Sequence, residues 1–207
     1  MITIVDYNAG NLTSVKRAFD YLGIPCAITP DPDAIRKAER IVFPGVGHAA
    51  SAIAFLTQRG IDAALRETFE KGTPILGICL GCQIILTFSE EGNTRCIDLI
   101  PGTVRRFKLS DPALKIPHMG WNQITISKPH KLLSEVKTGD AFYFVHSYYP
   151  APDDAACTFA TTDYETIFPV AIGRGNLFAT QFHPEKSGRI GLTMLKRFSE
   201  WDGNHAE

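Results

Sequence analysis

A short apolar segment near the middle of the sequence ends in a glycine–cysteine–glycine turn. Residues 74–78 are apolar, as in a central strand of a parallel sheet, and a helical pattern begins at Leu80. Between them lies Gly77-Ile78-Cys79-Leu80-Gly81, a G-x-C-x-G sequence. The flanking glycines allow a strand and a helix to approach where larger side chains would clash. The segment predicts a nucleophile elbow, with the Cys79 sulfur pointing into solvent at the end of a sheet.

The first half of the chain alternates short apolar runs with amphipathic ones. Strands are expected at residues 2–5, 24–29, 40–43 and 74–78, and helices at residues 49–58 and 61–71. Another helix is expected between Asn11, which can cap it, and Gly23, which can end it. This alternation predicts an α/β fold in which a mostly parallel central sheet is covered by helices on both faces.

The second half is rich in β-branched and aromatic residues from about residue 101 to residue 182. Strands are expected at residues 142–149, 157–162 and 177–182, and a helical pattern runs from Lys186 to a polar tail at residues 203–207. No linker composition separates the two halves. We therefore interpret residues 1–207 as a single domain with a strand-rich C-terminal half.

Composition and charge argue against several classes of function. Hydrophobic residues make up 44% of the 207 residues, as in ordinary globular proteins, and the net charge of −1 gives no attraction to nucleic acid or to an anionic membrane. The first residues lack the basic and apolar regions of a signal peptide, and no run has the roughly 18 apolar residues of a spanning helix. Five cysteines are then expected to stay reduced, which indicates the cytoplasm.

Cys79 has competing interpretations. Cys79-Leu80-Gly81-Cys82 is also a C-x-x-C motif between a strand and a helix, the setting of a thioredoxin-like redox pair, and the spacing alone does not exclude that function. A zinc site needs a second ligand pair, and the sequence has no second C-x-x-C motif, so no metal is expected. A buried structural role is the default for the three remaining cysteines, Cys26, Cys96 and Cys157.

His183 and Glu185 lie two residues apart where an apolar run stops. Pro184, between them, prevents the strand from continuing. A cysteine nucleophile needs a base for its thiol proton and a carboxylate that orients the imidazole, and these two residues supply both. Alone, the His-Pro-Glu sequence is more typical of a surface turn. Its combination with the elbow favours a catalytic triad.

These motifs resemble those of the class I (triad-type) glutamine amidotransferases, which join G-x-C-x-G-x-Q to a later H-P-E. Both are complete here, at residues 77–83 and 183–185, and the resemblance covers essentially the whole chain. It implies hydrolysis of L-glutamine with Cys79 as nucleophile, His183 as base and Glu185 as the orienting carboxylate, without a cofactor.

Further runs narrow the resemblance to the glutaminase subunit of imidazole glycerol phosphate synthase. They are residues 6–11 (DYNAGN), 44–47 (PGVG), 117–122 (PHMGWN), 142–148 (FYFVHSY) and 183–187 (HPEKS). This resemblance implies a heterodimer with a separate TIM-barrel cyclase. Ammonia would pass through the barrel to make imidazole glycerol phosphate and aminoimidazole carboxamide ribotide in histidine biosynthesis. The glutaminase of another synthase, a stand-alone cysteine hydrolase and a catalytically silent scaffold are the alternatives.

The resemblance also implies roles for residues around the triad. The backbone N–H groups of Leu80, next to the nucleophile, and of Val46 would bind the oxyanion. Substrate contacts are expected from Gly47, Gln83, Glu91, His146, Ser147 and Tyr148, and cyclase contacts from Asn11, Trp121, Tyr143 and Lys186. Glu91 is otherwise a solvated charge after the Leu80 helix, and Trp121 is otherwise a core residue.

Cys82 stands where the family pattern has methionine. One helical turn separates it from Cys79, which is compatible with the Cα separation of a disulfide. We state the hypothesis that oxidation joins the two sulfurs and switches the activity off.

Overall fold

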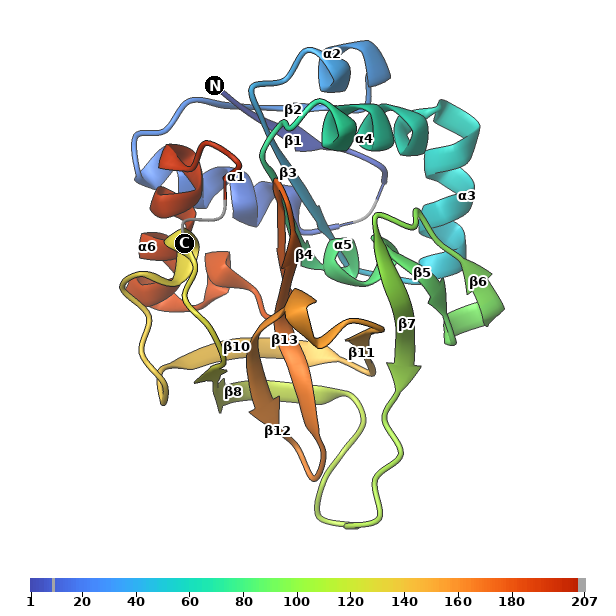
Figure 1. Ribbon diagram of the computed structural model, residues 1–207, viewed down its shortest axis with the longest axis vertical. Coiled ribbons are helices and arrows are strands. Elements are labelled where there is room, and N and C mark those ends of the chain that lie inside the picture. The colour runs from blue at the N-terminus through green and yellow to red at the C-terminus, as the bar shows by residue number, and fades with distance from the viewer. Residues whose placement is uncertain (9, 205–207) are drawn as a thin grey trace.

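A central sheet of eight strands organises the molecule (Figure 1). The computed structural model describes residues 1–8 and 10–204, so Ala9 and the last three residues of the expected polar tail lie outside the described part. The strand order is β2-β1-β3-β4-β14-β13-β12-β9. The first five of these strands are parallel to one another, and the last three continue the sheet in antiparallel pairs. The mostly parallel sheet expected from the sequence is confirmed.

The parallel half of the sheet comes almost entirely from the first 80 residues. Its strands are β1 (Ile2–Val5), β2 (Cys26–Thr29), β3 (Arg40–Gly45) and β4 (Ile75–Cys79). The connecting helices are α1 (Leu12–Tyr21), α2 (Pro32–Arg36), α3 (Ala49–Arg59) and α4 (Ile61–Glu70), and α5 (Leu80–Ile84) follows β4. β3 was expected to stop at Phe43, but it keeps its pairing with β4 through the register pair of Gly45 with Cys79.

The C-terminal half supplies β14 (Leu177–Thr180), β13 (Ile167–Arg174), β12 (Thr158–Asp163) and β9 (Thr125–Ile126), followed by helix α6 (Gly188–Glu200). A second sheet has the order β11-β7-β5-β6, and β10 pairs with β8 separately. These strands are β5 (Leu86–Ser89), β6 (Thr94–Arg95), β7 (Ile100–Arg106), β8 (His118–Gln123), β10 (Ala141–His146) and β11 (Tyr148–Pro152). The described part of the chain also contains four single turns of 3₁₀ helix: η1 (Glu91–Asn93), η2 (Lys131–Leu133), η3 (Ala155–Cys157) and η4 (Pro184–Lys186).

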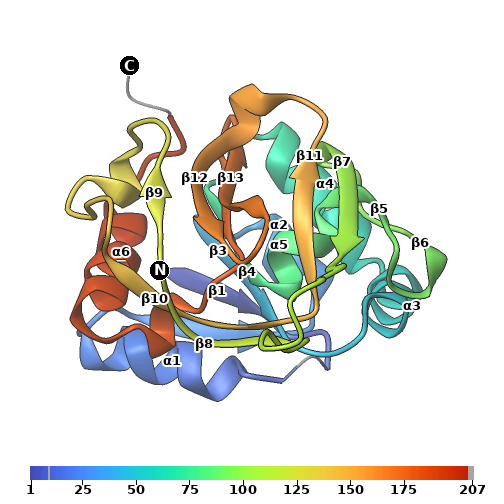
Figure 2. The ribbon, with the colours of Figure 1, turned by 90° about the horizontal axis from the view of Figure 1, so that it is seen from below.

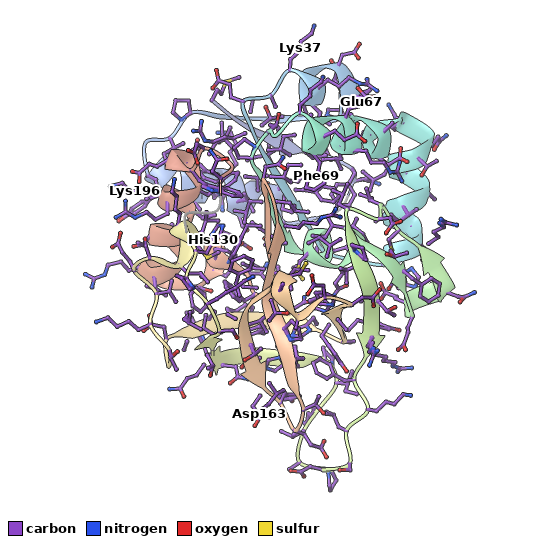
Figure 3. The ribbon with its side chains drawn as sticks, in the orientation of Figure 1. Lys37, Glu67, Phe69, His130, Asp163 and Lys196 are labelled. Atoms are coloured by element: carbon purple, nitrogen blue, oxygen red, sulfur yellow. The ribbon has the colours of Figure 1, made fainter. Side chains whose placement is uncertain are left out.

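Helices cover both faces of the central sheet, as the alternating pattern predicted (Figure 2). On one face, Phe19 of α1 and Leu195 of α6 pack into a core that includes Leu76 of β4. On the other face, Leu56 of α3 and Leu65 of α4 pack into a second core with strand side chains. Side chains fill the space between these layers; His130, beside α6, stacks on Phe178 at 4.2 Å between ring centroids (Figure 3). Within the described residues, no helix is long and apolar enough to cross a membrane.

Two expected elements were wrong in their extent, and one expected helix cap lacks its side-chain hydrogen bond. The helix beginning at Leu80 ends at Ile84, because the chain turns into β5; Glu91 therefore lies in η1, after a strand, and not at the end of that helix. The single strand expected at residues 142–149 is two strands, β10 and β11, which belong to different sheets and separate at Ser147. Asn11 does occupy the N-cap position of α1, but with a left-handed backbone (φ 78°) and no capping hydrogen bond from its side chain.

Candidate active site

Cys79 lies at the tip of a strained strand-to-helix turn. It ends β4 and precedes α5. Its backbone angles, φ 54° and ψ −104°, are energetically costly for any residue other than glycine. A Cβ added to Gly81 would lie 1.8 Å from the carbonyl oxygen of Phe43, and one added to Gly77 would lie 2.9 Å from the Cβ of Ala179. The predicted elbow is therefore present, and its glycines are required by close backbone packing. The sulfur is less open than expected, since Cys79 is only 5% exposed.

His183 and Glu185 form a buried pair at the end of the neighbouring strand. β14 runs parallel to β4, with Thr180 beside Ile78, so the segment after β14 reaches the same edge of the sheet as Cys79. His183 Nδ1 lies 2.7 Å from Oε1 of Glu185, and both side chains are fully buried. The second ring nitrogen, Nε2, is buried without a geometrically defined hydrogen-bond partner in the described part of the chain. This nitrogen is the one available to the cysteine.

Electrostatics couple the imidazole to the sulfur. Burial alone would lower the pKa of His183, but the charge and hydrogen-bonding capacity of Cys79, with Glu185 behind the ring, raise that pKa to about 10. The imidazole is therefore protonated at neutral pH. A ring placed in this way can hold the proton that a cysteine nucleophile gives up.

Asn11 adds a contact that the sequence interpretation missed. Its amide Nδ2 lies 2.6 Å from Oε1 of Glu185 and 3.4 Å from Nδ1 of His183. The other carboxylate oxygen, Oε2, is buried without a partner among the described residues. Asn11 was expected at a partner interface; the structure brings its side chain onto the His183–Glu185 pair.

Gln181 also reaches the sulfur. Its Nε2 lies 3.7 Å from Sγ of Cys79, and the carbonyl oxygen of Val145 lies 4.0 Å from the same sulfur on the β10 side. Gln181 was not among the residues predicted from the sequence. A polar residue at the end of a buried strand, two positions before His183 and so with the same side-chain direction, was the available signal.

A cavity of about 310 Å³ opens beside Cys79. Residues assigned from the resemblance to the oxyanion site and the substrate line it together: Val46, Gly47, Leu80, Gln83, Glu91, His146, Ser147 and Tyr148. Gly45, before Val46, pairs in register with Cys79, which brings the Val46 loop to the nucleophile. Leu80 is the first residue of α5, so its N–H has no intrahelical acceptor and is free for an oxyanion.

Two of the expected substrate residues have side chains that are fixed by hydrogen bonds to other parts of the protein. Glu91 Oε2 accepts a 2.7 Å hydrogen bond from the backbone N–H of Ala49, which fixes its carboxylate at the start of α3. Gln83 is 5% exposed, and its Nε2 lies 2.9 Å from both the Tyr148 carbonyl and Oε1 of Gln181. Glu91 is thus neither a free surface charge nor a helix-end residue, and the Gln83 amide is oriented before any substrate arrives.

A pair of buried histidines lies behind the cavity. His146 Nδ1 lies 2.7 Å from the Tyr148 carbonyl, and His146 Nε2 lies 2.9 Å from His118 Nδ1. Burial lowers the pKa of His118 to about 4, and burial, together with His118 and His183 nearby, lowers that of His146 to about 3. Both rings are therefore neutral at pH 7. His118 is the second residue of the quoted PHMGWN run.

Three of the four residues expected at the cyclase interface lie close together beside β8 and β10. Trp121 and Tyr143 are register partners with ring centroids 6.2 Å apart, and Lys186 Nζ lies 6.0 Å from the Tyr143 ring. Trp121 is 59% exposed, so its interpretation as a core residue is wrong. We call Trp121, Tyr143 and Lys186 the docking surface.

Cys82 lies deeper in the protein than Cys79. It is fully buried, and burial, with Cys79 nearby, raises the pKa of its thiol well above the ordinary value. All five cysteines are free thiols. Within the described residues, no cluster of three or more His, Cys, Asp or Glu side chains is arranged to hold a metal ion.

The fold and the site together match one protein class. The family model of the class-I glutamine amidotransferases matches residues 3–200, and the chain belongs to that family. Two solved structures have the same fold: a glutamine amidotransferase (TM-score 0.71, 17% identity, covering 96% of this chain and all of that one) and PurLQS from Thermotoga maritima (TM-score 0.73, 16% identity, 96% and 97%). A thioredoxin-like protein is thereby excluded.

Curated relatives are much closer in sequence, and those compared here carry the name imidazole glycerol phosphate synthase subunit HisH. The protein from Nitratidesulfovibrio vulgaris strain DP4 is 48% identical over 206 residues, covering 97% of this chain and 96% of the relative. That from Moorella thermoacetica is 49% identical over 200 residues (96% and 94%), and that from Chromobacterium violaceum 45% over 210 residues (98% and 99%).

Proposed function

We propose that this chain is the glutaminase subunit of imidazole glycerol phosphate synthase, a single amidotransferase domain over residues 1–207. One observation carries the proposal: Cys79 and the buried His183–Glu185 pair lie at the ends of two adjacent parallel strands, β4 and β14, and Cys79 lines a cavity. The cavity is small enough to suit an amino acid. The identity of nearly half of all residues to relatives with this name, over almost their full length, supports the particular synthase.

The reaction follows from the geometry. The Cys79 thiolate attacks the side-chain amide carbon of L-glutamine, and the N–H groups of Leu80 and Val46 receive the negative charge of the oxyanion. His183 gives its proton from Nε2 to the leaving nitrogen, which departs as ammonia. Water, deprotonated by the now neutral His183, then attacks the thioester and releases glutamate. Glu185 stays ionised and holds the ring throughout.

Substrate recognition needs groups for both ends of an amino acid. Glu91, whose carboxylate lines the cavity from the start of α3, is assigned to the ammonium group. Gly47, Gln83 and the segment His146-Ser147-Tyr148 line the remaining wall and are assigned to the rest of the substrate.

The partner is assigned as a TIM-barrel cyclase that binds the docking surface, with Asn11 beside it. The exposed Trp121 ring beside the half-buried Tyr143 ring is typical of interface anchors. Lys186 follows Glu185 directly, so a partner that contacts Lys186 lies next to the triad and can receive ammonia. Five free cysteines fit a reducing compartment, and we place the complex in the cytoplasm.

Glutamate release with and without a purified cyclase partner tests the proposal. Wild type should hydrolyse glutamine in the presence of the partner, and Cys79→Ala should not. Partner-independent hydrolysis of other amides or esters would instead indicate a stand-alone hydrolase. No turnover with any cyclase, despite complex formation, would refute the glutaminase function.

A further inference from the structure

Gln181 places a hydrogen-bond donor against the nucleophile without belonging to the triad. The side chain is fully buried, and its Nε2 lies 3.7 Å from Sγ of Cys79. An amide nitrogen can only donate, so this contact is favourable to the sulfur and most favourable when the sulfur carries a negative charge. The other close polar atom on that side, the Val145 carbonyl oxygen at 4.0 Å, can accept only from a neutral thiol.

The orientation of the Gln181 amide is fixed by Gln83. Oε1 of Gln181 lies 2.9 Å from Nε2 of Gln83, and the same Gln83 nitrogen donates to the Tyr148 carbonyl at 2.9 Å. A reversed Gln181 amide would set N–H against N–H at Gln83 and oxygen against sulfur at Cys79. Only one orientation satisfies both neighbours, and it points the N–H at the sulfur.

The same chain of hydrogen bonds extends away from the active site. The Tyr148 carbonyl also accepts from Nδ1 of His146, so Nε2 of His146 must accept from Nδ1 of His118. Nδ2 of Asn122 then donates to the remaining nitrogen of His118 at 3.3 Å. All these groups are uncharged, and each has one assignable direction. This fixes the carbonyl of Tyr148 and, through Gln83, the Gln181 amide.

We propose that Gln181 is a positioning residue that donates an N–H···S hydrogen bond to the Cys79 thiolate, holds the sulfur at the cavity and favours its anionic form. The inference deepens the proposed function and rests on it for the identity of the reaction. Gln181 and His183 then have different roles toward Cys79. The His183 imidazole takes the thiol proton, and the Gln181 amide stabilises the negative charge on the sulfur.

The pH dependence of Cys79 alkylation measures this effect directly. The full-length chain is treated with iodoacetamide across a pH series, and modification of the Cys79 peptide is followed by mass spectrometry. Gln181→Leu, which has no donor, should raise the pH midpoint of alkylation by about one unit. Gln181→Glu keeps an acceptor for Gln83 but turns an oxygen toward the sulfur, and should raise the midpoint at least as much.

Thr180→Val is the matched control. Thr180 is also fully buried in the same segment, and its Oγ1 donates to the Phe182 carbonyl at 2.9 Å, away from the sulfur. This variant should lower the melting temperature to an extent similar to the Gln181 variants, but its alkylation midpoint should equal that of wild type. With the cyclase partner and glutamine, Gln181→Leu should lower kcat about tenfold with little change in KM, because the change lies at the nucleophile.

The outcomes separate this inference from the proposed function. Unchanged alkylation midpoints in both Gln181 variants would overturn the inference, whatever the glutaminase assay gives; if Gln181→Leu does not fold, the Gln181→Glu midpoint decides. A raised midpoint in a protein that never hydrolyses glutamine would support the role of Gln181 toward the sulfur and refute only the glutaminase function. A midpoint shift in Thr180→Val equal to that of Gln181→Leu would also overturn the inference, since the effect would then be one of general packing.

Discussion

Asn11 and His183 share one oxygen of Glu185. The Asn11 amide lies 2.6 Å from Oε1, and Nδ1 of His183 lies 2.7 Å from the same atom. Asn11 begins α1, so the N-terminal helix is fastened to the catalytic pair 174 residues further along the chain. A residue expected to cap a helix and to contact a partner is thus also a support for the His183–Glu185 pair, and a movement of the start of α1 would move the carboxylate.

Removal of this support should affect turnover more than substrate binding. In Asn11→Ala, Glu185 loses a donor and holds the His183 ring less firmly, so kcat should fall about 10- to 100-fold while KM changes little. Asn11→Asp places a like charge against Glu185 and should be worse. Steady-state glutaminase kinetics with the partner at saturating concentration test this. Full recovery of kcat at high partner concentration would contradict it and leave Asn11 a docking residue only.

Cys82 should be dispensable for the chemistry. Because the Cys82 thiol is fully buried and its pKa is raised, it is a poor nucleophile and a poor disulfide partner. Cys82→Ala should keep glutaminase activity within about threefold of wild type, whereas Cys79→Ala should abolish it. Equal losses in the two variants, or an oxidant-dependent mass loss of two hydrogens on the Cys79–Cys82 peptide with inactivation, would support the disulfide switch instead.

Gly81 should tolerate no side chain. A Cβ at this position would overlap the Phe43 carbonyl oxygen at 1.8 Å, so Gly81→Ala must displace β3 from α5 and should cost more than about 4 kcal/mol of unfolding free energy. Gly23→Ala is a useful comparison: its backbone is left-handed (φ 68°) with open space around the new atom, and it should cost about 1 kcal/mol. Chemical denaturation measures both. Similar losses would mean that the elbow relaxes easily.

Acid should destabilise the protein through its buried histidines. Burial lowers the pKa of His118 to about 4 and that of His146 to about 3, while the unfolded chain titrates near 6.5. From pH 6.5 down to about 4 the unfolded state binds more protons than the folded state, so the free energy of unfolding falls with falling pH. His118→Asn should make this slope shallower. Equal slopes in wild type and His118→Asn would argue against neutral buried rings.

His183 should have the opposite dependence. Its folded-state pKa is raised to about 10, so its stabilising contribution is fully present below pH 6.5 and is lost as the pH rises through about 10. The free energy of unfolding of wild type should therefore decrease in alkaline solution more steeply than that of His183→Gln. Chemical denaturation at a series of pH values from 6.5 to 10.5 measures both slopes. An identical alkaline decline in the two proteins would show that His183 is not the group responsible.

Trp121 should matter to the partner and not to the fold. Because the side chain is 59% exposed, Trp121→Ala should change the free energy of unfolding by less than about 1 kcal/mol. As an exposed aromatic anchor beside Tyr143, it should contribute about 2 kcal/mol or more to cyclase binding, a loss of about 30-fold in affinity. Tyr21→Ala, which removes another exposed aromatic ring far along α1, is the control and should leave binding unchanged. Titration calorimetry with the cyclase provides the measurement.

Local patterns predicted most of the N-terminal half because each strand and helix there is consecutive in sequence and adjacent in the sheet. The elbow was predicted in detail, since glycines flanking Cys79 have no other good explanation. The split of residues 142–149 into β10 and β11 could not be predicted, because the two strands differ only in their partners, β8 and β7, and pairing is a tertiary property. The same holds for the early end of α5, where tertiary pairing of β5 overrides a helical pattern.

The triad was predictable from motif chemistry, but its surroundings were not. Asn11 and Gln181 have ordinary sequence roles, as a helix cap and a polar residue in a strand, and their positions at Glu185 and Cys79 result from long-range packing. The residues of the docking surface were predicted only from the family resemblance. The exposure of Trp121 depends on which side of β8 faces solvent, and the sequence does not show this. The sequence motifs therefore indicated the proposed reactive groups, but they did not indicate the residues that hold those groups in position.

The ladder between β4 and β14 has a consequence for how the protein is made. Cys79 and Gln181 are neighbours across this ladder and 102 residues apart in the chain. A growing polypeptide that has been synthesised only as far as α5 contains Cys79 but neither Gln181 nor His183. In this fragment the edge of β4 that later pairs with β14 has no neighbouring strand. In the proposed mechanism, a fragment that lacks His183 should not release ammonia, and activity should begin only when β14 has paired with β4.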